Sequence, residues 1–196
     1  VPEGSEVRKS GLVADDVLVL SQPLGTGTLF AAHMQGKVEG RYIEAAINAM
    51  QQSSRQAAEI FLSHHVNGMT DVTGFGLAGH LSEMLVASQK AAELKLTSIP
   101  ALPGALETLS REGITSTLHD ANRQSALVHL DAIRPEAVDS AARYELLFDP
   151  QTAGGLLAGI AADKAEDCLN ALRSAGYNAV VIGKVTTGPC MISLAE

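Results

Sequence analysis

The chain has 196 residues, enough for one domain or two small ones with a buried core, and a formal net charge of −8 at pH 7. This acidic balance argues against a general binder of nucleic acid or of an anionic membrane, which needs a basic patch. Hydrophobic residues make up 46% and aromatic residues only 4%, so the predicted core is globular and mainly aliphatic.

The cysteines and the chain start indicate a cellular compartment. Cys168 and Cys190 match no metal or redox spacing, and nothing indicates a disulfide framework. No apolar run approaches the roughly 18 residues of a membrane span. Val1–Glu6 does not resemble a signal peptide, and the missing initiator Met is expected of a fragment or a processed product. We therefore expect a cytoplasmic location.

The first predicted strand follows a polar lead-in. Residues 1–14 are predicted to be irregular, as in a linker, and the domain is predicted to span 15–196. The apolar run Asp16–Leu20 indicates a strand covered on both faces. A Gly-rich turn, Ser21–Thr28, and an apolar helix to Gly36 follow. The turn matches neither phosphate-loop nor dinucleotide patterns, and is either an anion-facing loop or a turn that needs two flexible residues.

Residues 40–65 are Ala-rich and predict a helix, in which Gln51–Ser54 marks a break or a polar face. Asn67-Gly68 is predicted to end this helix with a left-handed cap. A short strand then leads to Asp71.

The stretch Met69–Met84 contains the most informative pattern of the chain. Asp71 precedes two glycines, Gly74 and Gly76, and an amphipathic helix. That helix is predicted from a stripe at helical spacing: Leu77, Leu81, Met84, Leu85 and Ser88. A tight turn at a helix start directs backbone N–H groups at an anion, and a carboxylate beside a phosphate needs a cation such as Mg²⁺. Alternatively, Asp71 only satisfies nearby amides and the glycines only supply positive φ.

The middle of the chain is weakly patterned. Ala91–Ile99 alternates as a strand, and Pro103-Gly104 opens a helix to about Arg111. Within 113–143 we predict a strand near 126–130. Arg134–Glu136 is predicted to begin a turn or short helix.

A third Gly-rich segment, Phe148–Leu157, precedes a small-residue strand, Gly155–Ala161. Asp163 and Glu166 resemble a capping box of a helix that ends at Gly176. Its apolar stripe is Ala165, Cys168, Leu169 and Leu172, which makes Cys168 a core residue rather than a nucleophile. The final strands are Ala179–Lys184 and Cys190–Leu194. Interleaved strands and helices without strict βαβ repetition predict an α+β layered domain with a mixed sheet.

Motifs of hydrolytic or zinc chemistry are missing from the sequence. None of the six histidines has zinc-ligand spacing, and no Gly-x-Ser-x-Gly elbow occurs. His80 and Glu83 are one helical turn apart, but His80 borders the apolar stripe. We interpret His80 as a hydrogen-bonded structural residue.

Four motifs together resemble the selenophosphate synthetase (selenide, water dikinase) family. The segment Thr70–Met84 resembles the family signature, and Pro23–Gly27 resembles its Lys-Pro-Leu-Gly-Thr-Gly segment. Asp149–Leu157 resembles its Asp-Pro-Gln-Thr-Ser-Gly-Gly-Leu segment, and Ile182–Val185 resembles its closing strand. The four motifs occur in the family's order. Together they cover most of this chain, but they correspond only to the C-terminal half of a family protein.

The resemblance implies a fold and an activity. The implied fold is the C-terminal domain of aminoimidazole ribonucleotide synthetase, with α/β/α layers around a mixed sheet. The family converts ATP, selenide and water to selenophosphate, AMP and phosphate, for selenocysteine and selenouridine synthesis. Its nucleophile, the Lys partner, two metal-binding aspartates and most ATP contacts belong to the N-terminal half. No catalytic residue is therefore expected here, and the fragment alone is expected to be inactive.

By resemblance, Asp71 is a ligand of the Mg²⁺ on the ATP phosphates, and we expect Thr73, Gly74 and Gly76 to contact ATP. The implied partners are the N-terminal domain, ATP, selenide and a second copy in a homodimer. Gln22 replaces a family Lys, which would weaken a phosphate contact, and Ala153 replaces a Ser with little expected effect. The alternatives are a thiamine monophosphate kinase, a hydrogenase-maturation protein, or a non-catalytic binding or dimerisation domain.

Overall fold

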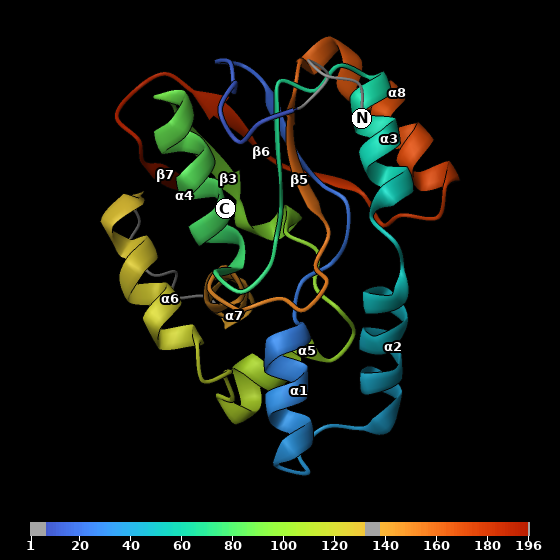
Figure 1. The fold of residues 1–196 in the computed structure, drawn as a ribbon. Helices are drawn as coiled ribbons and strands as arrows, with labels where there is room; N and C mark the ends of the chain where they lie inside the picture. The colour runs from blue at the N-terminus through green and yellow to red at the C-terminus, as the bar shows by residue number, and fades with distance from the viewer. Residues whose placement is uncertain (1–6, 132–137, 196) are drawn as a thin grey trace.

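The computed structural model describes residues 7–131 and 138–195, built around one seven-stranded sheet of order β2-β5-β1-β6-β3-β7-β4 (Figure 1). The strands are β1 (Val17–Leu20), β2 (Gly68–Asp71), β3 (Ala91–Lys95), β4 (Leu130–Asp131), β5 (Leu156–Ile160), β6 (Val180–Thr186) and β7 (Ile192–Ala195). The helices are α1 (Thr26–Met34), α2 (Gly40–Gln51), α3 (Arg55–Ser63), α4 (Gly76–Ser88), α5 (Ala105–Glu107), α6 (His119–Ala126), α7 (Val138–Leu146) and α8 (Ala162–Ser174). Three short helical turns complete the described elements: η1 (Leu96–Ser98), η2 (Thr108–Glu112) and η3 (Leu127–His129).

Helices cover both faces of the sheet. On one face, α3 and α8 lie side by side and bury Phe61, Cys168 and Leu172 against β1 and β5. On the other face, α4, α6 and α7 share a core cluster with the sheet that includes Leu81 and Phe148. Helices α1, α2 and α5 form a smaller cluster at one end (Figure 1). These layers confirm the predicted α+β fold with α/β/α layers.

The sheet is mixed, as predicted. Neighbouring strands are antiparallel from β2 through β5, β1 and β6 to β3, whereas β3, β7 and β4 are parallel. Strand β2 lies at one edge, where Asp71 is paired with Leu156 of β5. Asp71 is therefore delivered at the end of an edge strand.

The predicted helix over residues 40–65 is two helices, because the chain breaks at Gln52–Ser54 between α2 and α3. The predicted left-handed cap at Asn67-Gly68 is wrong. The positive φ of 55° belongs to His65, and Gly68 begins β2. The Asn67 side chain instead donates to the buried Asp16 carboxylate at 2.8 Å.

Several boundaries also differ from the prediction. The strand predicted near 126–130 is wrong over most of its length, because α6 and η3 occupy His119–His129 and only Leu130–Asp131 is extended. The strand predicted at 91–99 ends at Lys95, and η1 begins at the next residue, Leu96. The capping box at Asp163 is wrong too, because α8 begins at Ala162 and no side chain caps it. The turn predicted at Arg134–Glu136 lies outside the described residues.

Residues 7–14 are irregular but packed. Leu12 is 3% exposed, and its amide donates to the Ser88 hydroxyl at 3.1 Å. Lys9 pairs with Glu83 of α4 at 2.6 Å between Nζ and Oε2. The division into a 1–14 lead-in and a 15–196 domain stays a prediction. Across the described ranges, no helix has both the length and the hydrophobicity to cross a bilayer.

Candidate functional site

The predicted site residues run from the last residue of β2, Asp71, through the turn at Thr73 and Gly74 to the first residue of α4, Gly76. Asp71 is exposed at the end of β2, and the next amide, of Val72, still donates to Gly155 O at 2.9 Å. The Thr73 carbonyl accepts from the amides of Gly76, at 3.1 Å, and Gln151, at 3.0 Å. The turn is therefore closed on itself and fastened to the third Gly-rich segment.

A glycine is required where this turn enters α4. Gly76 has a φ of +71°, and a Cβ there would lie 2.8 Å from the Leu147 carbonyl oxygen. The Ala78 amide donates to that same oxygen at 3.0 Å. The amides of Gly76 and Ala78 are thus bonded within the fold, and a bound anion would have to meet other groups of the turn.

His80 supports the turn from inside α4. Its side chain is buried, and Nε2 lies 3.1 Å from the Thr73 hydroxyl oxygen. Nδ1 is 3.6 Å from Glu83 Oε2, too long for a hydrogen bond. Burial lowers the pKa of His80, which favours a neutral ring at neutral pH. The interpretation of His80 as a hydrogen-bonded structural residue is confirmed.

The first and third Gly-rich segments meet around Gln151. Its Oε1 accepts from the Gly25 amide at 2.9 Å and from the Thr26 hydroxyl at 3.2 Å. Its Nε2 donates to Asp149 Oδ2 at 2.9 Å, and Thr28 donates to Asp149 Oδ1 at 2.9 Å. The three Gly-rich segments, which are far apart in the sequence, are therefore joined in one hydrogen-bonded assembly.

The Asp149 carboxyl group makes stability depend on pH. Burial raises its pKa from 3.8 to about 6, although the bonds from Thr28 and Gln151 act in the opposite sense. The folded chain therefore holds a proton that the unfolded chain has released between pH 3.8 and about 6, and this contribution to stability is lost as the pH rises through that window. Relative to Asp149→Asn, the wild type should lose about 2.5 kcal/mol of unfolding free energy between pH 4 and pH 7. Urea unfolding at both pH values measures this, and a pH-independent difference between the two proteins would contradict it.

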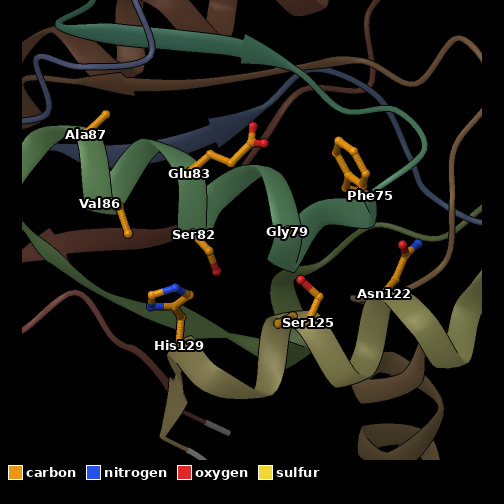
Figure 2. Close-up of a pocket in the computed structure, with 10 residues that line it drawn as sticks. Phe75, Gly79, Ser82, Glu83, Val86, Ala87, Asn122, Ser125 and His129 are labelled. Carbon is orange, nitrogen blue, oxygen red and sulfur yellow. The ribbon is translucent and has the colours of Figure 1, made fainter.

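A groove of about 500 Å³ lies between α4 and α6, beside the turn (Figure 2). Ser125 and His129 face Ser82 and Val86 across it. Phe75 stands at one end and is 60% exposed. The groove is mainly apolar, and the described residues that line it include the Glu83 carboxylate but no Lys or Arg, so it does not resemble a phosphate site.

Two supporting residues were missed by sequence reasoning, because they fall in the weakly patterned region. Asn122 of α6 donates to the carbonyl oxygens of Gly74, at 2.8 Å, and Phe148, at 3.0 Å. The buried His119 lies with Nε2 3.1 Å from the Glu145 carbonyl oxygen. Burial lowers the pKa of His119, but hydrogen bonds with Glu145 and Asp120 outweigh it and raise that pKa overall. The sequence of α6 is polar and has no apolar period, so nothing in it indicates that Asn122 and His119 contact other segments.

The described residues offer one part of a metal site. Within 7–131 and 138–195, no group of three or more His, Cys, Asp or Glu side chains could hold a metal ion. Asp71, exposed at a strand end, suits one oxygen ligand of a hard cation such as Mg²⁺. The other ligands would have to be water, phosphate oxygens or groups from another part of the protein.

The structure shows the surroundings of the two residues that depart from the family pattern, Gln22 and Ala153. Gln22 is 2% exposed, with Nε2 3.4 Å from Gln52 Oε1, so its side chain is enclosed rather than offered to solvent. Ala153 has a φ of +48°, a strained conformation that a Ser would share.

Cys168 is fully buried, and burial raises its pKa to about 11. Its predicted role as a core residue is confirmed.

Comparisons with known proteins agree with this arrangement. The family model "AIR synthase related protein, C-terminal domain" matches residues 13–192. The chain is 38% identical over 181 residues to a selenide, water dikinase of Myxococcus xanthus, covering 91% of this chain and 50% of that protein. It is 37% identical over 183 residues to the enzyme of the same name from Porphyromonas gingivalis, covering 92% and 51%. The chain thus spans about half the length of these curated relatives.

Solved structures share the fold at lower identity. A thiamine-monophosphate kinase from Stenotrophomonas maltophilia is 18% identical with a TM-score of 0.66, covering 99% of this chain and 54% of that one. The hydrogenase maturation protein HypE, solved in complex with ATP, is 17% identical with a TM-score of 0.65, covering 92% and 45%. The resemblance to selenide, water dikinases is confirmed, and the chain belongs to the family of AIR synthase related proteins, as a C-terminal domain of that family.

Proposed function

We propose that this chain is the C-terminal domain of a selenide, water dikinase, which makes selenophosphate, AMP and phosphate from ATP, selenide and water. The observation that carries the proposal is sequence identity. The chain is 38% identical to a selenide, water dikinase, against 18% to the thiamine-monophosphate kinase that shares its fold. The two rival activities from the same superfamily therefore have weaker support.

Asp71 is the chain's own contribution to the chemistry in this proposal. Its exposed carboxylate would be one ligand of a Mg²⁺ ion on the ATP phosphates, and that ion would neutralise charge that develops during phosphoryl transfer. The Thr73 hydroxyl and the Gly74 amide are the groups proposed to meet phosphate oxygens. Gly76 contributes through the shape of the turn, because its amide is already bonded to Thr73 O.

The remaining machinery is proposed to come from an N-terminal half. The chain spans about half of its curated relatives, and no group of three or more His, Cys, Asp or Glu side chains among its described residues could hold a metal ion. We therefore expect this domain to be inactive alone and to act with the N-terminal domain in a homodimer. A cytoplasmic location fits its two free cysteines.

The test uses the protein extended upstream to its natural start. It is incubated with ATP, Mg²⁺ and selenide, and the products are identified by phosphorus NMR. Selenophosphate together with AMP is expected. ADP as the nucleotide product would instead favour a kinase of the thiamine monophosphate or hydrogenase-maturation type. A protein that turns over no ATP would favour a binding or dimerisation domain that kept the fold.

A further inference from the structure

The Gln151 side chain is a buried connection between segments far apart in the chain. It is 4% exposed and lies in the loop before β5. Its Oε1 accepts from the Gly25 amide at 2.9 Å, the Thr26 amide at 3.3 Å and the Thr26 hydroxyl at 3.2 Å. Its Nε2 donates to Asp149 O at 2.8 Å and to Asp149 Oδ2 at 2.9 Å. Both ends of this amide are therefore fully used.

Gln151 acts as the missing cap of α1. The N-cap position is Gly25, which has no side chain to accept from the first amides of the helix. A side chain could not be added there, since Gly25 has a φ of +128° and its Cβ would lie 2.5 Å from Ala105 Cβ. Gln151 Oε1 supplies the acceptor instead, from 126 residues further along the chain.

The other side of the same loop touches the turn that carries Asp71. The backbone amide of Gln151 donates to Thr73 O at 3.0 Å, and the backbone amide of Val72 donates to Gly155 O at 2.9 Å. Gly154 packs so closely that a Cβ would lie 2.2 Å from Val72 O. The loop thus lies between the start of α1 and residues 72–73, and Gln151 is hydrogen-bonded to both.

We infer that Gln151 is a positioning residue for Asp71 and Thr73, an inference that rests on the proposed function. Among the described residues, the buried side chain bonds Gly25, Thr26 and Asp149, so it acts on the site through the backbone of its own loop. The bonds to α1 and Asp149 fix that loop, and the loop fixes the carbonyl of Thr73. Preorganisation of the turn then places the Asp71 carboxylate where a phosphate-bound cation would meet it.

The variants separate positioning from general stability. Gln151→Ala removes both ends of the connection. Gln56→Ala is the matched control, because Gln56 is an exposed glutamine of α3 on the opposite layer. Gln151→Glu keeps an acceptor for α1 but sets carboxylate against carboxylate at Asp149. Adding Asp149→Asn restores a donor toward position 151 and keeps an acceptor for Thr28.

Two readouts are made on the protein extended to its natural start. Hydrogen–deuterium exchange without ligand reports the turn, and the Mg²⁺ concentration for half-maximal AMP release, measured well below the melting temperature, reports the site. Gln151→Ala should raise exchange at residues 24–28 and 71–76 by about tenfold and raise the Mg²⁺ requirement several-fold. Gln56→Ala should change neither, and the double variant should recover part of what Gln151→Glu loses.

Two results would count against these proposals, and they can be told apart. A Gln151→Ala protein with a lower melting temperature but unchanged exchange at 71–76 and an unchanged Mg²⁺ requirement would overturn the positioning role. If the wild type released no AMP, the proposed function would fail on its own, and the exchange measurement would still decide whether Gln151 holds the turn.

Discussion

Asp71→Ala is expected to slow AMP release by the complete protein by about 100-fold or more, because one ligand of the proposed phosphate-bound cation is lost. The melting temperature should stay within about 2 °C of the wild type, since an exposed side chain contributes little to stability. A coupled assay for AMP, run at saturating and at limiting Mg²⁺, measures the effect.

Two further variants make this result specific to the carboxylate. Asp71→Asn keeps the size of the side chain but removes its charge, and should be nearly as slow as Asp71→Ala. Asp167→Ala removes another exposed carboxylate, from α8, which packs with α3 on one face of the sheet, and should behave as the wild type. Equal rates for Asp71→Ala and Asp167→Ala would remove Asp71 from the proposed site.

Gly154→Ala is expected to destabilise the fold by about 3 kcal/mol, the upper end of typical overpacking costs. A Cβ at residue 154 would lie 2.2 Å from the Val72 carbonyl oxygen, so the backbone between β2 and β5 would have to separate. Because the Val72–Gly155 hydrogen bond lies in the same place, the shift would also move the turn that follows Asp71. Urea unfolding, with the midpoint and slope compared to the wild type, measures this loss.

Gly74→Ala is the matched control in the neighbouring turn. A Cβ at residue 74 would meet nothing within 4 Å, and Gly74 has no positive φ. Its stability should lie within about 0.5 kcal/mol of the wild type. If Gly154→Ala were as stable as Gly74→Ala, the close approach of residue 154 to Val72 would not require a glycine, and the prediction would be wrong.

The parts of the fold that depend on a repeating apolar pattern were predictable. The stripe from Leu77 to Ser88 is α4, and the run after Asp16 is β1. The stripe has the period of a helix with one buried face, and the continuous short run is typical of a strand covered on both faces. The α+β class followed from the order of those elements.

Elements held by single polar contacts were not predictable in the same way. Helix α6 is held by Asn122 and His119, which bond carbonyl oxygens of other segments, and such bonds leave no periodicity. The end of α3 depends on a positive φ at His65, where the sequence offered Asn67-Gly68 as the more usual cap. Asn67 and Gly68 instead lie alongside β5, where the Asn67 backbone amide donates to Gly159 O and the Asn67 side chain donates to Asp16.

The candidate site was predictable in part. The residues around Asp71 were identified from a carboxylate, two glycines and a helix start, and their roles toward ATP and Mg²⁺ stay predictions. The resemblance identified the three Gly-rich segments as motifs of a single family. Their assembly around Gln151 could not be foreseen, because hydrogen bonds between residues more than 120 positions apart follow from the tertiary fold alone.

The most direct test is one pair of phosphorus NMR time courses on the complete protein with ATP, Mg²⁺ and selenide, one of the wild type and one of Asp71→Ala. We expect selenophosphate and AMP to accumulate together in the wild type and neither to accumulate in the variant. Selenophosphate and AMP formed at the same rate by Asp71→Ala would contradict the proposed role of Asp71.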